Sequence, residues 1–354
     1  MDLALSNLAL HHLIEENQII INGFINKVQT TPTGFLKLKV HTKEGDKTLI
    51  ATESAIFITK QSISAKQNPG GFSSFIKKYI FNQRIISLKQ KEFDRIVLME
   101  FPDVTLIFEL FSKGNVILCN KNFKILRAMK KEKWKDRELK KDEIYKFPSS
   151  RGKNPLNISE TEFLNNLKEN KKTIFGAIID ILNVAPGILN FIFEENKWNK
   201  TIDASKITSE NSNKILKEIK QIYSKKEEGV FILDNIIYSI NIKTNKEFDS
   251  ISDLLNEKVF LENTVVQRKE ETKSKVRKQD YQSQIDQCII EENEFLETGE
   301  KIYLEYQLLQ KIINDITTLR KNNLLDKEIE NKLKSVHPEL KEIKLEKNKL
   351  LIEI

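Results

Sequence analysis

An acid and an arginine stand side by side in Glu92-Phe93-Asp94-Arg95, directly before the apolar run 96–101. The planar guanidinium of arginine can donate paired hydrogen bonds to a phosphate or a base edge, and a carboxylate can accept from amines or from a ribose 2′-hydroxyl. Adjacent residues inside a strand face opposite sides, but the irregular start of a strand lets both reach one rim. Asp94 and Arg95 are therefore candidate ligand contacts. The simpler alternative is an aspartate that caps a turn beside a surface arginine.

A second candidate is the turn and helix at 69–82. Pro69-Gly70-Gly71 leads into a run whose apolar residues recur at helical spacing, and Lys77 and Lys78 lie in the same helix. The free N–H groups at a helix start can bind an anion. A plain turn and helix start explains the same residues, so both interpretations stay open.

Positive charge gathers in residues 121–146, which hold eleven Lys or Arg and five Asp or Glu, an excess of 11 − 5 = 6. This is nearly the whole net charge of +7. Clustered lysines can neutralise the phosphates of a nucleic acid, although a solvated charged face is the simpler explanation. The candidate contacts to an RNA backbone in and just before this segment are Lys113, Asn115, Lys130, Lys131, Lys133 and Lys135.

The most apolar stretch, residues 175–193, is predicted to be a buried helical hairpin. Asp180, Asn183, Asn190 and a Pro-Gly break interrupt it, and a membrane-spanning helix rarely carries such residues. The turn at 185–187 is similar to that of a helix-hairpin-helix, in which exposed N–H groups contact a backbone phosphate without reading sequence. A hairpin that only packs is equally well supported, since Pro186 removes one donor.

Several kinds of chemistry find no support in the sequence. It has no phosphate-binding glycine loop, no dinucleotide-binding motif and no nucleophile elbow. Its four histidines, His11, His12, His41 and His337, have no carboxylate or thiol at ligand spacing. We therefore expect no catalytic residue, no metal and no cofactor. Cys119 and Cys288 are too few for a disulfide framework, and no secretory signal precedes the first helix, so a cytoplasmic location without membrane contact is expected.

The chain of 354 residues is long enough for two or three domains. Residues 1–150 combine helices near 5–17 and 71–82 with short alternating strands, which predicts an α+β domain of antiparallel meanders. Residues 156–225 are helical, with a capping box at Ser159. Strand alternation returns in 226–262. We expect these strands to complete the first domain, which makes the helical part an insertion.

Residues 266–354 are predicted to form a coiled-coil hairpin. Their apolar positions advance by four and three residues, as in a coiled-coil seam, through Ile302, Tyr306, Leu309, Ile313 and Ile316. The expected form is a long antiparallel helical pair that turns near residues 320–323. The last residues, 346–354, resemble the beginning of an unpaired strand.

At Asp94 and Arg95 the sequence resembles the NFACT family of ribosome quality-control tail-elongation factors, also known as fibronectin-binding protein A-like. The resemblance rests on FDRIVLMEF (93–101), LIFELFSKGNVILCNKNFKIL (106–126), EKWKDRELKKDEIYKFP (132–148) and PGGFSSFIKKYI (69–80). It implies an N-terminal domain similar to that of formamidopyrimidine-DNA glycosylases, a helix-hairpin-helix insertion and a coiled coil.

The resemblance also implies a function. Members of this family bind the large ribosomal subunit with a stalled peptidyl-tRNA and recruit aminoacyl-tRNA, and untemplated residues are added to the C-terminus of the nascent chain. The ribosome makes the bonds, so the protein is expected to be a binding factor and not an enzyme. Asp94 and Arg95 match the pair implicated in tRNA binding.

Three departures from related proteins bear on this expectation. Residue 2 is Asp2 and not the proline that glycosylases use as a nucleophile, so glycosylase chemistry is not expected. Ala9 stands where the family usually has a further functional aspartate. The family's C-terminal RNA-binding domain is not in this sequence, and a separate chain is one possible source of it. A surface adhesin remains the alternative function, which the missing signal and the cysteine usage oppose.

Overall fold

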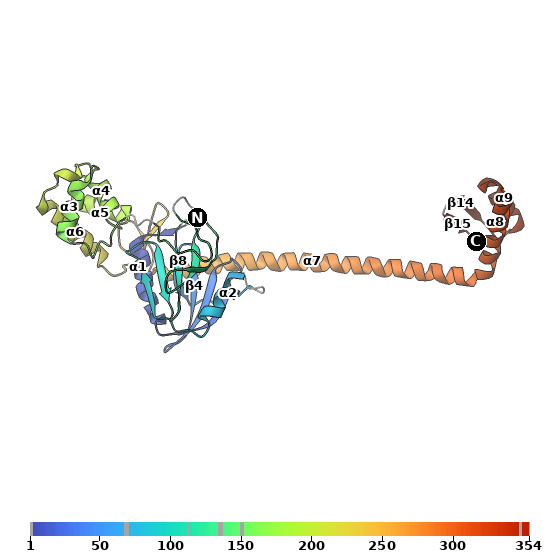
Figure 1. The fold of residues 1–354 in the computed structure, drawn as a ribbon, viewed down its shortest axis with the longest axis horizontal. Coiled ribbons are helices and arrows are strands. Elements are labelled where there is room, and N and C mark those ends of the chain that lie inside the picture. The colour runs from blue at the N-terminus through green and yellow to red at the C-terminus, as the bar shows by residue number, and fades with distance from the viewer. Residues whose placement is uncertain are drawn as a thin grey trace. The chain divides into compact units, whose positions relative to one another are not determined.

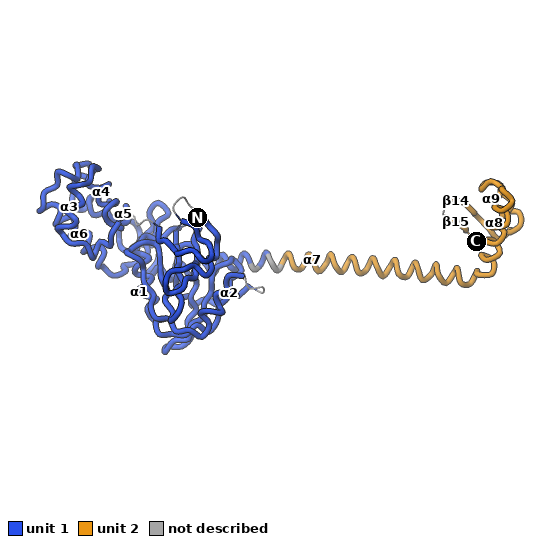
Figure 2. Tube along the Cα trace, viewed as in Figure 1, with its two compact units in different colours: residues 1–269 blue, residues 270–354 orange. Residues whose placement is uncertain are grey.

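The computed structural model describes residues 3–66, 71–111, 113–133, 137–148, 152–346 and 349–353, apart from the side chains of residues 267, 270 and 271. The chain divides into two compact units, residues 1–269 and residues 270–354 (Figure 1, Figure 2). We call them unit 1 and unit 2. The mixture of helices and sheets confirms the predicted α+β class.

The first sheet of unit 1 is an antiparallel meander in the order of the chain. Its strands are β2 (Phe24–Thr30), β3 (Leu36–Thr42), β4 (Gly45–Ala51) and β5 (Ile56–Thr59). The alternation that predicted β3 buries Leu36, Leu38 and Val40 on one face. Gly45 follows the β3–β4 turn with a φ of +96°, a conformation that glycine adopts without strain.

The second sheet has five antiparallel strands in the order β10-β9-β8-β7-β6. They are β6 (Ser87–Gln90), β7 (Ile96–Glu100), β8 (Val104–Glu109), β9 (Asn115–Asn120) and β10 (Ile125–Ala128). The two sheets share one hydrophobic core with the helices α1 (Asn7–Glu16) and α2 (Gly71–Ile80). A short 3-10 helix, η1 (Asn17–Ile20), follows α1.

A smaller core covers the other face of the five-stranded sheet. Ile107 and Ile117 of the sheet meet Leu139 and Tyr145 from the segment 137–148, which follows β10. Glu109 is only 1% exposed on this side, and its carboxylate accepts hydrogen bonds from both terminal nitrogens of Arg137 and, at 2.7 Å, from the Tyr145 hydroxyl. This buried ion pair attaches the segment to the sheet.

The strands after the helical part pair with the beginning of the chain. The third sheet has the order β1-β12-β11-β13, formed by β1 (Ala4–Leu5), β11 (Val230–Leu233), β12 (Ile236–Tyr238) and β13 (Lys246–Phe248). β1 runs parallel to β12, with Ala4 opposite Ile236. The returning strands thus form a small sheet with β1 and do not extend either of the larger sheets.

The residues 156–225, which we call the helical lobe, contain α3 (Glu160–Glu169), α4 (Ile174–Ile181), α5 (Pro186–Glu195), a 3-10 turn η2 (Ala204–Lys206) and α6 (Ser209–Tyr223). Ser159, Thr173 and Thr208 cap α3, α4 and α6, each with its hydroxyl accepting from a backbone N–H three residues on. The lobe core also takes in Leu8 and Phe93 from outside the lobe. The lobe therefore packs directly on the rest of unit 1.

Helix α7 (Ile251–Leu304) begins in unit 1, where Ile251, Leu254 and Leu255 join the larger core. Every described residue from 272 to 304 is exposed. The long coiled-coil hairpin predicted for 266–354 is accordingly not seen in the part of the chain that the structure describes. In the same described ranges, no helix has both the length and the apolarity needed to cross a membrane.

Unit 2 closes with two helices and a β-hairpin, α8 (Tyr306–Lys321), α9 (Asp326–Val336), β14 (Glu342–Glu346) and β15 (Lys349–Glu353). The predicted seam is interrupted at Glu305, between α7 and α8. The chain does turn near the predicted place, after Lys321. The prediction of an unpaired terminal strand was wrong, because β15 pairs along its whole length with β14, whose Glu342–Glu346 also alternates in polarity.

We predict that removing the guanidinium of Arg137 destabilises unit 1. In Arg137→Met the Glu109 carboxylate stays buried without its cation, and breaking a buried ion pair in this way costs about 3–5 kcal/mol. Urea denaturation should show a loss of this size in the free energy of unfolding. Glu109→Leu combined with Arg137→Met should recover part of it, because no buried charge then remains.

The matched control is Lys141→Met, which alters an exposed lysine of the same segment. It should change the free energy of unfolding by less than about 0.5 kcal/mol. Equal effects of the Arg137 and Lys141 variants would contradict the structural role given to the ion pair.

Candidate nucleic-acid interface

One end of the five-stranded sheet brings together candidate residues that are far apart in the sequence. Ile96 of β7 lies opposite Glu109 of β8, which lies opposite Asn115 of β9. The Asn115 side chain in turn bonds the backbone of Lys130, just beyond β10. Since neighbouring strands lie about 4.8 Å apart, this row is roughly 14 Å long. The loop before β7, the β8–β9 turn and the segment after β10 thus border the same end of the sheet.

The loop before β7 carries Asp94 and Arg95, and both are partly exposed. Its backbone passes through left-handed conformations at Glu92 and Phe93, with φ angles of +46° and +55°. The N–H of Asp94 donates to the Lys91 carbonyl at 2.6 Å, and the Asp94 carboxylate accepts from the N–H of Arg95 at 2.7 Å. The simpler interpretation, an aspartate that caps a turn, therefore describes part of the geometry. The bond to the Arg95 N–H uses only one of the two carboxylate oxygens.

The β8–β9 turn is fixed by Asn115, which is only 4% exposed. Its side-chain oxygen accepts from the N–H of Lys130 at 3.0 Å, and its amide donates to the Lys130 carbonyl at 2.9 Å. The Lys130 ammonium pairs with Glu53 at 2.8 Å and also donates to the Lys113 carbonyl. Asn115 thus fixes the segment after β10, and the charge of Lys130 is partly compensated.

Three further lysines of the candidate set lie around this turn. Lys113, Lys131 and Lys133 are exposed, and Lys113 and Lys133 line an open cavity of about 380 Å³ whose other lining residues are Glu109, Phe111, Gly114, Asn115 and Glu132. Lys135 lies outside the described residues. The basic segment thus presents Lys131 and Lys133 beside the sheet end, next to Lys113.

Lys77 and Lys78 lie elsewhere, on α2, which packs against β2 and β10. Both are exposed, and the Lys77 ammonium stands 5.6 Å from the centre of the Phe81 ring. Pro69 and Gly70, the other part of this candidate, lie outside the described residues. Gly71 is the first helical residue, and a Cβ added there would lie 3.5 Å from the guanidinium of Arg127 on β10.

The turn between α4 and α5 is engaged in internal contacts. Residues 182–185 are buried, and a Cβ at Gly187 would lie 2.2 Å from the Tyr238 hydroxyl of β12. The N–H of Ala185 donates to the Tyr223 hydroxyl at 2.8 Å. Burial raises the pKa of that hydroxyl well above its usual range, so it stays protonated. The turn therefore serves as a joint between the helical lobe and the sheet.

Sequence reasoning missed the polar residues of this joint. Asn183 donates to the Glu92 carbonyl at 2.7 Å across 91 residues of sequence, and Asn7 contacts both Asn183 and Tyr223. The one available signal was a polar Asn183 inside an apolar stretch. Ala9, at the position of the family aspartate, is fully buried in the larger core.

Two solved structures share the fold of this chain. The N-terminal part of the fibronectin/fibrinogen-binding protein from Streptococcus suis aligns with a TM-score of 0.56 at 19% identity, covering 72% of this chain and 98% of that one. The fibrinogen binding protein from Staphylococcus aureus also gives 0.56 at 19% identity, with coverages of 71% and 97%. This likeness concerns the fold.

The chain belongs to the NFACT family, because the family model described as NFACT N-terminal and middle domains matches residues 6–353. The archaeal Rqc2 homolog aRqcH of Methanocaldococcus jannaschii is 25% identical over 89% of this chain and 52% of that protein. Ribosome quality control complex subunit 2 of Saccharomyces cerevisiae is 37% identical over 73 residues, 20% of this chain and 7% of that protein. The chain spans about half the length of the archaeal relative.

We predict that the lysines at the sheet end contribute to RNA affinity through phosphate contacts. Each contact adds roughly 0.7–0.9 to the slope of log affinity against log salt, so Lys113→Gln, Lys131→Gln and Lys133→Gln together should lower this slope by up to about 2–3. The measurement is binding of a labelled unfractionated tRNA over a series of salt concentrations.

The matched control neutralises Lys121 and Lys124, which belong to the same basic segment but follow β9 at the opposite end of the sheet. Their replacement should leave the slope unchanged. If the two sets of variants lower the slope equally, binding is spread over the basic segment and the sheet end has no special part.

Proposed function

We propose that this protein acts in ribosome quality control in the cytoplasm. In this proposal it binds the large ribosomal subunit that carries a stalled peptidyl-tRNA and recruits aminoacyl-tRNA for untemplated extension of the nascent chain. The family match over residues 6–353 carries the proposal. Relatives named ribosome quality control complex subunit 2 and Rqc2 homolog RqcH support it.

Asp94 and Arg95 are the proposed tRNA contacts. The guanidinium of Arg95 suits the paired oxygens of a phosphate or the edge of a guanine, and the second oxygen of the Asp94 carboxylate suits a ribose hydroxyl or a base amine. Lys113, Lys131 and Lys133 at the same sheet end supply positive charge for the neighbouring phosphates. The candidate interface thus combines directional hydrogen bonds from Asp94 and Arg95 with a positively charged surface formed by the three lysines.

The proposed role is that of a binding factor and not of an enzyme. The ribosome already holds the peptidyl-transferase chemistry, so a factor that positions an aminoacyl-tRNA needs no nucleophile or cofactor of its own. The proposal accordingly assigns binding to Asp94 and Arg95 and no covalent step to any residue.

The second candidate function is binding of an extracellular matrix protein. The observation that favours it is the fold shared with proteins named for fibronectin and fibrinogen binding. Surface plasmon resonance with immobilised fibronectin tests it directly. Saturable binding by the intact chain, together with its recovery from the cell surface, would support the adhesin over the ribosomal factor.

We predict that Asp94→Ala combined with Arg95→Ala lowers the amount of tRNA bound while ribosome association is retained. The pair is expected to contact tRNA, whereas anchoring on the ribosome should involve other surfaces as well. The measurement is sedimentation with large ribosomal subunits, followed by sequencing and quantification of the tRNA that co-purifies.

Asp103→Ala combined with Lys121→Ala provides the matched control. These residues form an exposed ion pair of 3.7 Å between the β7–β8 turn and the residue after β9, at the other end of the same sheet. The control should retain the wild-type load of tRNA. A wild-type load in the Asp94 and Arg95 variant as well would remove these residues from the proposed site.

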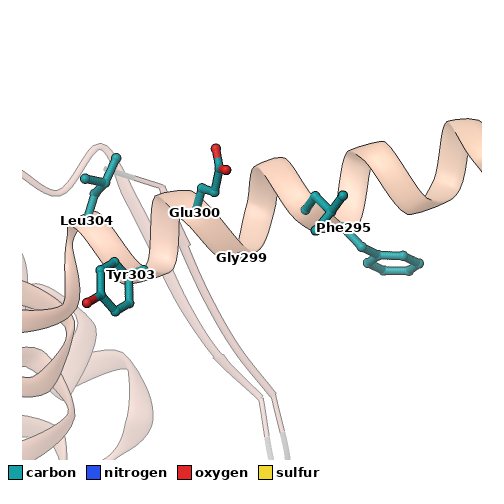
Figure 3. Close-up of a pocket in the computed structure, with 6 residues that line it drawn as sticks. Phe295, Gly299, Glu300, Tyr303 and Leu304 are labelled. Atoms are coloured by element: carbon teal, nitrogen blue, oxygen red, sulfur yellow. The ribbon is translucent and has the colours of Figure 1, made fainter.

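We further propose that α7 forms a coiled coil with a helix not present in the structure. Phe295, Leu296, Tyr303 and Leu304 are between 59% and 82% exposed, and they surround Gly299 (Figure 3). Within the residues that the structure describes, and apart from the adjacent residues and the helix's own backbone, no atom lies within 4 Å of where a Cβ of Gly299 would be, so this position has room for a bulky side chain. An apolar helix face of this kind is usually covered in a folded protein.

The charges of α7 indicate what the covering helix should look like. Residues 279–300 contain seven Asp or Glu and no Lys or Arg. A helix with lysines and arginines flanking its apolar stripe would complement this pattern. We propose that such a helix comes from a polypeptide that carries the family's C-terminal RNA-binding domain.

We predict that a benzophenone attached to Cys288 captures this helix. Cys288 is exposed on α7, whereas burial raises the pKa of the Cys119 thiol to about 12, so a maleimide reagent should label Cys288 alone. After irradiation of the protein purified from its native source, mass spectrometry should identify a crosslinked peptide that is rich in Lys or Arg.

The control moves the thiol to the other side of α7. Ser283→Cys in a Cys288→Ser background places it about 140° around the helix, since successive residues are about 100° apart. This variant should give no crosslinked peptide. Equal capture from both positions, or none from Cys288, would contradict a coiled coil on the apolar face.

A further inference from the structure

The loop before Asp94 and Arg95 has a backbone conformation that its residues do not favour. Glu92 and Phe93 both have φ angles in the left-handed region, at +46° and +55°, where a residue with a Cβ is strained. The Asp94 N–H bond to the Lys91 carbonyl closes a β-turn around them. Hairpin turns with two left-handed central residues usually carry Asn and Gly there, so Glu and Phe need further contacts to hold them. The contacts of this loop therefore show what fixes the position of the two candidate tRNA contacts.

The helical lobe holds the loop through Asn183. The side-chain amide of Asn183 donates to the Glu92 carbonyl at 2.7 Å, and the backbone carbonyl of Asn183 accepts from the side-chain amide of Asn7. Asn183 is 9% exposed and lies in the turn between α4 and α5. A hydrogen bond to the carbonyl of the strained Glu92 itself is well placed to keep that peptide in this orientation.

Asn7 and Tyr223 complete the network. The Asn7 side-chain oxygen accepts from the Tyr223 hydroxyl at 3.0 Å, and that hydroxyl accepts from the N–H of Ala185. The Asn7 carbonyl accepts from the side-chain amide of Gln90 at 3.0 Å, which also donates to the Asp94 carbonyl at 3.0 Å. Hydrogen bonds thus join α1 and the helical lobe to the loop at both of its ends.

The Phe93 side chain anchors the same loop in the helical lobe. It is only 5% exposed and belongs to the lobe core, with its ring centre 4.4 Å from that of His11 and 5.5 Å from that of Tyr223. The edge-on contact with Tyr223 is a favoured aromatic geometry. Apolar packing and hydrogen bonds therefore act on neighbouring residues of the loop.

We propose that Asn183 is a positioning residue, through which the helical lobe sets the conformation of Asp94 and Arg95 for tRNA binding. This inference rests on the proposed function, in which that pair contacts tRNA. The helical lobe then influences tRNA affinity from its joint with the sheet, without this turn touching the RNA.

The first test compares Asn183→Ala with Asn196→Ala in the full chain. Asn196 is an exposed residue of the same lobe that also bonds a backbone carbonyl, that of Ile192 at 2.9 Å. Only Asn183→Ala should accelerate hydrogen exchange of the Asp94 and Arg95 amides, by tenfold or more. It should also weaken binding of a labelled unfractionated tRNA by about tenfold, which corresponds to ~1.4 kcal/mol.

The second test uses a suppressor that distinguishes positioning from general packing. Glycine adopts a positive φ without strain, so Glu92→Gly should restore much of the tRNA affinity that Asn183→Ala loses. If Asn183 only packs the helical lobe, a change at residue 92 restores nothing. Should Asn183→Ala fail to fold, Asn183→Leu keeps the branched shape of the side chain while removing the donor, and the same comparison applies.

A triple variant separates this inference from the proposed function. In Asp94→Ala with Arg95→Ala, adding Asn183→Ala should cause no further loss of tRNA affinity. If the double variant binds tRNA like the wild type, the part of the proposed function that assigns tRNA contacts to Asp94 and Arg95 fails, and the exchange rates still report on the loop. If the double variant loses affinity but Asn183→Ala alone does not, the positioning role of Asn183 is overturned.

Discussion

Strand β8 is covered on both faces, and this constraint determines where the candidate interface lies. Leu106 and Phe108 face the larger core, whereas Ile107 faces the smaller one. Glu109 follows on the side of Ile107, so its carboxylate is enclosed and needs a cation, which Arg137 provides. The basic segment after β10 is thereby attached to the sheet. Its lysines are therefore held at the same end of the sheet as the loop before β7.

The helical lobe is equally dependent on its surroundings. Its core takes in Leu8 of α1, Phe93 of the loop and Tyr238 of β12, so residues outside the lobe complete it. A lobe whose core includes residues from neighbouring elements does not move independently of them. The loop that carries Asp94 and Arg95 lies at this joint, and its conformation therefore reflects both parts of unit 1.

The sequence was sufficient for several elements whose structure depends on neighbouring residues, although the regular spacing at 302–316 wrongly predicted one unbroken seam across Glu305. The alternation at 36–42 places Leu36, Leu38 and Val40 inside, and Ser159 caps α3 as its position before the helix indicates. Contacts between distant residues carry no such signal. The bond of Asn183 to Glu92 and the hydrogen bonds of Asn115 with Lys130 depend on how finished elements meet, so periodicity could not reveal them.

The pairing of β1 with β12 links the very beginning of unit 1 to its last strands, and this order matters while the chain is being made. Ala4 lies opposite Ile236, a separation of 236 − 4 = 232 residues. At a synthesis rate of 5–20 residues per second, the first strand waits on the order of 10–50 s for its partner. During that interval α1 lacks the side of its packing that β12 supplies. Unit 1 therefore reaches its final form only after the helical lobe has been synthesised, a topology that favours slow, late closure over stepwise folding from the N-terminus.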